Sequence, residues 1–272
     1  SVPVISFTGS TATGAAIGSN LGRATFLPYK EKTLLLACGI ASGISSAFGA
    51  PIAGVLFALE VLLIDVSITS FIPLLISAAI GALLAKIILG DNVLLTFNSI
   101  KDFNSNNIFL YVGIGLLSGC MCLFYTRTFH WIDHRFTAMR TPVQRWLIGS
   151  VLLGVLIFFF PQLFGEGYSF IKTLTETGQI PKNSILIAHT NNEWLILLFI
   201  AGTMFFKVFA TGFTLMGGGN GGSFAPSLII GALLGFVVGR FFQLIGYADV
   251  PVTNFVVVGM AGMLSGLFFA PL

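Results

Sequence analysis

Two short glycine-containing strings, far apart in the chain, resemble each other and constrain the fold more than any other feature. They are Gly9-Ser10-Thr11-Ala12-Thr13 and Gly222-Ser223-Phe224-Ala225-Pro226, and each opens an apolar segment. Aligned without gaps, residues 9–22 and 222–235 agree at half of their positions, and residues 39–51 and 259–271 form a second matching pair at nearly the same offset. The sequence therefore predicts an internally duplicated fold, with first-repeat motifs at 9–61 and second-repeat motifs at 217–272.

The composition of these strings favours an anion path. Apolar segments that glycine or proline interrupts at corresponding places in two halves point to a transport site between the repeats, where helix N-termini face an anionic substrate. Glycine allows backbone N–H groups to turn inward and form an anion nest without a charged side chain. The predicted anion-binding residues are Ser10, Thr11, Ala12, Gly222, Ser223 and Phe224.

The composition also predicts a membrane protein. Hydrophobic residues make up 56% of the chain and charged residues only 8%, against about 25% charged in a soluble domain. Apolar stretches recur at about 33–64, 71–89, 107–126, 145–160, 194–215, 225–246 and 252–272. Breaks near Pro51 and between Met216 and Pro226 favour short or re-entrant helices, which are stable at membrane depth only inside protein or beside water. We expect one all-α membrane domain over 1–272, with about ten helices including half-helices.

The distribution of basic residues predicts the orientation. Arg127, Arg135, Arg140 and Arg145 fall in what reads as a loop after the third apolar run, so that loop is expected to be cytoplasmic. The polar segment Asp91 to Asn107 is expected on the opposite side. The net charge of +3 does not indicate a nucleic-acid partner, because the basic residues lie in short loops.

Five charged residues lie inside or beside apolar runs, where each is costly unless it faces protein or water: Glu60, Asp65, Lys86, Lys207 and Arg240. Glu60 is expected to line an inner vestibule or to cap a helix end. Lys207 either adds positive potential to the inner anion path or places its ammonium at the membrane interface. Lys86 and Arg240, near segment ends, are expected to reach the interface.

The remaining reactive side chains do not indicate a cofactor. Cys38, Cys120 and Cys122 fall inside apolar runs and are expected in the core, without disulfides. His130 and His134 lie four residues apart beside Asp133, a possible metal-binding face, but two histidines and one carboxylate beside a basic loop favour no metal. We expect no metal and no cofactor, with chloride as the transported ion.

Three motifs resemble the CLC chloride channel and transporter family. Residues 222–226 fit its G-x-F-x-P anion-filter signature, residues 47–61 (AFGAPIAGVLFALEV) resemble its apolar motif, and residues 259–272 resemble the later copy of that motif. The likeness runs from Gly9 to Leu272. It implies an inverted-repeat helical bundle, a homodimer with one anion path per subunit, and a filter in which the amides of Ser223 and Phe224 hold chloride.

The chain departs from the family pattern at two positions. The first string usually reads G-R/K-E-G-P, with the glutamate acting as gate and proton acceptor, but Thr11 stands at that position here, and the first acidic residue is Glu31. Thr11 can donate a hydrogen bond to an anion there, and a place as an ordinary helix N-cap is compatible with this role. Antiporters of the family carry a second glutamate directly after the one matching Glu60, and this chain has Val61. The resemblance therefore predicts passive anion conduction.

Two other functions compete with this prediction. An anion/proton antiporter would need a substitute proton path through Glu60 or through residues outside 1–272. A membrane-embedded enzyme lacks a carboxylate pair, a Ser/His or Cys/His arrangement and a metal-ligand cluster at depth, so we expect no enzyme. Because residue 1 already lies in an apolar stretch and Leu272 ends in the middle of a repeated motif, we expect the family domain to extend beyond both ends. The expected location is multi-pass in a plasma or inner membrane, with small anions and lipid as partners.

Overall fold

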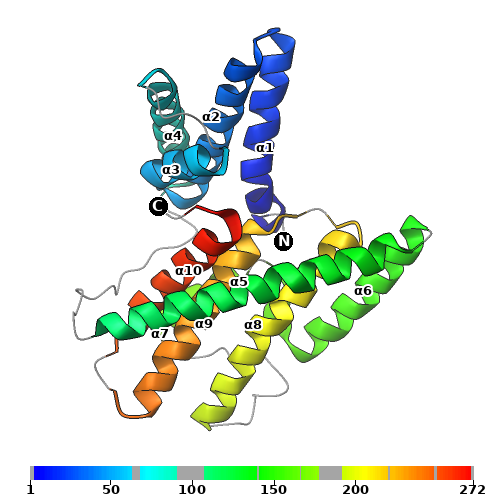
Figure 1. Ribbon diagram of the computed structural model, residues 1–272, viewed down its shortest axis with the longest axis vertical. Helices are drawn as coiled ribbons and strands as arrows, with labels where there is room; N and C mark the ends of the chain where they lie inside the picture. Colours follow the sequence, from blue (N-terminus) through cyan, green and yellow to red (C-terminus); the bar gives the residue numbers. More distant parts are fainter. Residues whose placement is uncertain are drawn as a thin grey trace. The chain divides into compact units, whose positions relative to one another are not determined.

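The computed structural model describes residues 3–62, 68–90, 107–139, 141–165, 167–177, 192–219, 221–247 and 250–270. These residues form ten α-helices and a short 3-10 helix, with no strand among them (Figure 1). The chain divides into two compact units, which are described separately: residues 1–96 with 268–272, and residues 97–267. The predicted all-helical class is confirmed.

The first unit contains four helices: α1 (Pro3–Ala24), α2 (Tyr29–Phe48), α3 (Pro51–Leu62) and α4 (Ile68–Leu89). The predicted break near Pro51 is present. Gly49 adopts a left-handed conformation (φ 64°), and its N–H donates to the carbonyl of Ser45 at 2.9 Å, which ends α2. Pro51 then begins α3, because proline suits the first turn of a helix and cannot continue the preceding one.

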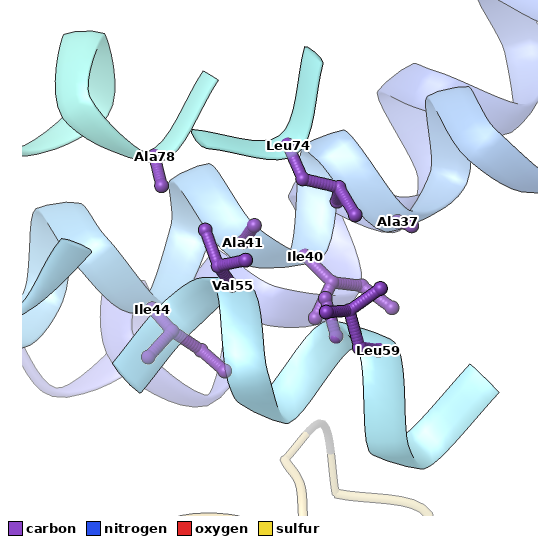
Figure 2. Close-up of a cluster of buried hydrophobic side chains, with 9 residues drawn as sticks. Ala37, Ile40, Ala41, Ile44, Val55, Leu59, Leu74 and Ala78 are labelled. Carbon is purple, nitrogen blue, oxygen red and sulfur yellow. The ribbon is translucent and has the colours of Figure 1, made fainter. Parts of the chain in front are cut away.

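Helix α2 lies at the centre of the first unit and packs against α1, α3 and α4. Figure 2 shows the core that results, where alanine positions let the helices approach and larger side chains fill the space between them. The labelled side chains are Ala37, Ile40, Ala41 and Ile44 from α2, Val55 and Leu59 from α3, and Leu74 and Ala78 from α4. The hydroxyl of Ser77 also donates to the carbonyl of Cys38 at 2.9 Å, which ties α4 to α2.

The second unit contains α5 (Ile108–Thr137), α6 (Pro142–Phe159), η2 (Pro161–Leu163), α7 (Tyr168–Thr177), α8 (Glu193–Met216), α9 (Phe224–Leu244) and most of α10 (Val252–Phe268). Side-chain caps are present at the start of α6 and of α8. Thr141 accepts from the N–H of Gln144 at 3.3 Å, and Asn192 accepts from the N–H of Trp194 at 3.0 Å. Arg145 of α6 donates to the carbonyls of Thr137 and Met139, each at 3.1 Å, and so satisfies the end of α5.

Among the described residues, five helices are long and apolar enough to cross a membrane: α4, α5, α6, α8 and α9. Their surroundings differ within the described structure. In each helix we consider the most apolar stretch of 18 residues. The buried share of that stretch is 56% in α8 and 61% in α9, but only 6% in α6. Helices α8 and α9 therefore form the interior of the second unit, and α6 presents its apolar surface outward.

Glycines bring two helix pairs into close contact. A Cβ on Gly14, Gly18 or Gly22 of α1 would collide with Gly39, Leu35 or Lys32 of α2. In the second unit, a Cβ on Gly231, Gly235 or Gly239 of α9 would crowd Gly259, Phe255 or Val252 of α10. The second pair of sequence repeats matches Gly39 with Gly259. Extended backwards at the same spacing, it also aligns Leu35 with Phe255 and Lys32 with Val252. The contact of α1 with α2 therefore repeats the contact of α9 with α10 at equivalent residues.

These contacts favour a second alignment of the first pair of repeats. The gapless alignment matches Gly18 with Gly231, whereas the contacts match Gly14 with Gly231, one helical turn earlier. The reason is that glycine recurs every four residues in both helices, so a shift by four restores the glycine pattern. In the aligned sequences, the contact-based register also matches Arg23 with Arg240, and it matches Ser6-Phe7, not Ser10-Thr11, with Ser223-Phe224.

The basic region after the third apolar run is helical, which corrects the loop prediction. Helix α5 continues to Thr137, so Arg127 and Arg135 lie on it, and Arg145 lies on α6. Hydrogen bonding within the helix, with support from the buried side chains of Ile132 and Phe136, explains why a polar segment stays helical. Arg140 and residues 91–106 lie outside the described residues. The cysteines described are free, Cys122 is buried, and Cys120 is exposed, so the core prediction is wrong for Cys120.

Candidate anion site

The second glycine string follows the end of α8, where the predicted break is present. The N–H of Gly217 donates to the carbonyl of Phe213 at 3.0 Å, and that of Gly219 donates to Thr214 at 2.8 Å. Between them, Gly218 has a φ of 94°, a conformation that a side chain would strain. The glycines thus end α8 and turn the chain toward the start of α9.

Ser223 occupies the N-cap position of α9, and Phe224 is the first helical residue. The Ser223 side chain makes no capping hydrogen bond, and no acidic residue lies in the first turn of the helix. Pro226 has no N–H, and the N–H of Ser227 already donates to the carbonyl of Ser223 at 3.1 Å. The positive end of the α9 dipole is therefore not neutralised by a carboxylate in its own first turn, as an anion site requires.

The start of α9 is partly buried: Ser223, Phe224 and Pro226 keep part of their surface exposed, and the residues packed behind them are buried. Ala225 is 2% exposed, Ser227 is fully buried, and the Ser227 hydroxyl donates to the carbonyl of Phe224 at 2.7 Å. Further along, the contacts of Gly231 and Gly235 with α10 hold the helix in place. A dipole that ends in a partly buried position is screened less by water than one at the surface.

The first glycine string lies within a helix. Helix α1 begins at Pro3 and continues through residues 9–12, so Thr11 is not at the N-cap of this helix. The side chains of residues 3–12 lie outside the described residues, and the two strings belong to different units. The assignment of Ser10, Thr11 and Ala12 to an anion site therefore stays a prediction.

The inner position that the resemblance singled out lies on α3. Val61 and Glu60 are both partly buried near the end of that helix. Val61 provides no titratable group, and the role of Glu60 in a vestibule stays a prediction. Asp65 lies outside the described residues.

The structure shows that Lys207 is buried and bound to backbone carbonyls, and its contribution to the potential of the anion path stays a prediction. The residue lies on α8 with 4% of its surface exposed, so its ammonium is enclosed by protein and does not extend from the surface of the second unit. Its ammonium donates to the carbonyl of Leu163 at 3.1 Å and to that of Gly165 at 2.7 Å. No sequence pattern indicated these partners, because both are backbone groups more than 40 residues away in the chain.

Two further charged residues lie at helix ends. The guanidinium of Arg240 donates to Glu193 at 3.3 Å and to the Gln243 side chain at 2.9 Å, which links the end of α9 to the start of α8. It is therefore held by protein groups while part of its side chain is exposed, and its position at the membrane interface stays a prediction. Lys86 is exposed in the last turn of α4.

The histidines of α5 lie on its exposed C-terminal part. His130 and His134 are exposed, and Asp133 accepts a hydrogen bond from the Thr137 hydroxyl at 3.3 Å. Across the ranges that the structure describes, no group of three or more His, Cys, Asp or Glu side chains is positioned to hold a metal ion.

Comparison with known proteins relates the chain to one family. A family model described as voltage gated chloride channel matches residues 9–272. A putative chloride channel protein, ClcB-like, from Ralstonia nicotianae is 30% identical over 262 residues, which are 95% of this chain and 57% of that protein. A voltage-gated ClC-type chloride channel ClcB from Escherichia coli is 28% identical over 261 residues, covering 95% of this chain and 59% of that protein.

A solved structure shows the same fold. The crystal structure of a CLC-type fluoride/proton antiporter superposes with a TM-score of 0.73 at 24% identity, covering 96% of this chain and 62% of that one. The chain therefore spans less than two thirds of the length of these relatives.

Proposed function

This chain belongs to the voltage gated chloride channel family, CLC, and we propose that it carries chloride or a similar small anion passively across a membrane. It is a multi-pass integral membrane protein by its family and its apolar helices. The observation that carries the proposal is the start of α9, a partly buried helix N-terminus without an acidic residue in its first turn. Backbone dipoles there replace part of the hydration of an anion without the tight hold of a fixed cation.

The two substituted positions favour conduction without proton coupling. Moving a proton across about 30 Å of hydrocarbon requires titratable or hydrated stations. Thr11 and Val61 provide no carboxylate at the positions where the family resemblance puts the gate and the inner proton site. Thr11 can donate a hydrogen bond to an anion, but it does not compete with the anion as a tethered charge.

The alternative is an anion/proton antiporter with a different proton path, for which Glu60 on α3 is the candidate station. The related fold of the fluoride/proton antiporter is the reason to test it. A homodimer with one path per subunit is the assembly that we propose for either mechanism.

Reconstitution in liposomes with simultaneous recording of chloride and pH separates the two mechanisms. A passive channel dissipates an imposed chloride gradient without driving protons uphill. A pH change driven by chloride alone, and abolished by a protonophore, would instead establish the antiporter. Protein-free liposomes provide the background, and an absence of protein-dependent chloride flux would contradict both mechanisms.

A further inference from the structure

A buried lysine joins two segments of the second unit. Lys207 lies in the interior of α8, and its ammonium is bound by the carbonyls of Leu163 and Gly165. A buried ammonium is costly unless hydrogen bonds and charges replace its hydration. These two bonds therefore fix the position of the segment that provides the carbonyls, not only that of the lysine.

That segment is the connection between α6 and α7, called here the strap and defined as residues 160–165 together with Gly167. The ring of Phe160 stacks on Phe199 with centroids 4.9 Å apart and packs against Phe206, also at 4.9 Å. Both partners are on α8. Helix α8 thus holds the strap at two places, by an aromatic contact at Phe160 and by Lys207 further along the strap.

The other end of the strap contacts α9. A Cβ on Gly167 would lie 3.3 Å from the Ile229 side chain, so the backbone of the strap packs directly on that residue. Gly167 also has a φ of 85°, which favours glycine at this contact. Ile229 is 2% exposed and lies five residues after Phe224, about 7.5 Å along the helix. Helix α7, which follows the strap, packs on α9 as well.

We propose that Lys207 is a positioning residue for the start of α9: by holding the strap on α8, it fixes the place of Ile229 and hence of Ser223 and Phe224. The interpretation of that helix end as an anion site rests on the proposed function. The contacts that lead from Lys207 to Ile229 do not depend on the proposed function. Lys207 acts through the strap and does not itself contact the anion.

The chemistry of lysine suits this role. The ammonium has three donors on a flexible stem and can satisfy two carbonyls that point from different directions. Methionine fills a similar volume but leaves the two carbonyls without this donor. Arginine keeps the charge and the donors in a planar fork, so it restores the strap only in part.

Hydrogen exchange with mass spectrometry on Lys207→Met tests the coupling without requiring transport. Amides in peptides covering 160–168 and 222–230 are expected to exchange at least about tenfold faster than in the wild type, since hydrogen bonds to a charged group are lost. The control is Lys30→Met, which removes an exposed lysine at the start of α2. Faster exchange in the strap alone, or in neither peptide, would overturn the proposal.

A second variant keeps the test decisive if Lys207→Met does not fold. Phe160→Leu loosens the strap at its aromatic contact and leaves the ammonium in place. The exchange of residues 222–230 is expected to rise as well, and unchanged exchange there would overturn the proposal.

Chloride titration of the same variants separates this inference from the proposed function. Chloride affinity is expected to fall at least about threefold in Lys207→Met and to recover partly in Lys207→Arg. Faster exchange at the start of α9 with unchanged chloride affinity would retain the positioning role and remove the anion from this helix end. Equal affinity losses in the Met and Arg variants would contradict the role of the ammonium in holding the strap.

Discussion

Gly14 on α1 and Gly39 on α2 approach so closely that a Cβ on either residue would overlap the carbonyl oxygen of the other. The obstacle is backbone in both directions, so a side chain rotation does not relieve it. The close crossing of α1 and α2 therefore depends on both residues being glycine.

Gly14→Ala and Gly39→Ala are expected to destabilise the protein by about 1 to 3 kcal/mol, because the helices must separate to admit a methyl group. The matched control is Gly154→Ala on α6, where nothing lies within 4 Å of the added Cβ. That change is expected to stabilise by about 0.5 to 1 kcal/mol through helix propensity. Thermal unfolding in detergent measures all three, and similar effects in all three would mean that the crossing is looser than described.

Thr11→Glu and Phe7→Glu distinguish the two registers of the repeat. If the sequence alignment identifies the anion site, Thr11→Glu places a carboxylate there, and chloride flux slows at neutral pH and recovers in acid as the charge is removed. If the contact-based register identifies it, Phe7→Glu produces this block and Thr11→Glu does not. Flux at two pH values in liposomes measures the effect. Unchanged flux in both folded variants would exclude both positions from the path.

Ser223→Ala and Ser223→Pro test the backbone contribution at the start of α9. The alanine variant keeps the amide and is expected to bind chloride nearly as the wild type does. Proline removes one N–H donor, which is worth about 1.5 to 3 kcal/mol toward a charged acceptor, so binding is expected to weaken at least about tenfold. Isothermal titration of both, with size-exclusion behaviour as the folding check, compares them. Equal losses would identify the hydroxyl as the ligand.

Glu193→Gln is expected to have a small effect. The Arg240–Glu193 pair is partly exposed, with side-chain exposures of 38% and 53%, so the loss is expected to stay below about 1 kcal/mol and to shrink with added salt. Thermal unfolding at low and high ionic strength checks this. A large loss that is independent of salt would indicate that the pair is buried in the assembled protein.

The apolar runs and their interruptions were predictable because each has a local cause. Proline at the start of α3 and the glycines after α8 act within a few residues of the breaks that they produce. The class of helical fold and the family followed from these patterns. The short helix α7 was not predicted, since it carries no long apolar run to distinguish it from a loop.

The register of α1 and the partners of Lys207 were not predictable for different reasons. Glycine recurs every four residues on α1, so a shift of the alignment by four residues matches the glycines equally well. The sequence therefore does not determine which glycine contacts Gly39. The acceptors of Lys207 are carbonyls, which every residue possesses, and only the path of the chain selects those of Leu163 and Gly165.

Helix α5 has 30 residues and is therefore about 45 Å long, whereas the hydrocarbon core of a bilayer is about 30 Å thick. Its part up to residue 126 matches that thickness at about 28 Å. The remainder, from Arg127 to Thr137, carries Trp131 with the Arg135 guanidinium 5.3 Å above its ring, a pair suited to the headgroup region. Because the helix is continuous, residues 127–137 and the part up to residue 126 move together. A force applied to residues 127–137 at the membrane surface therefore tilts the spanning part directly.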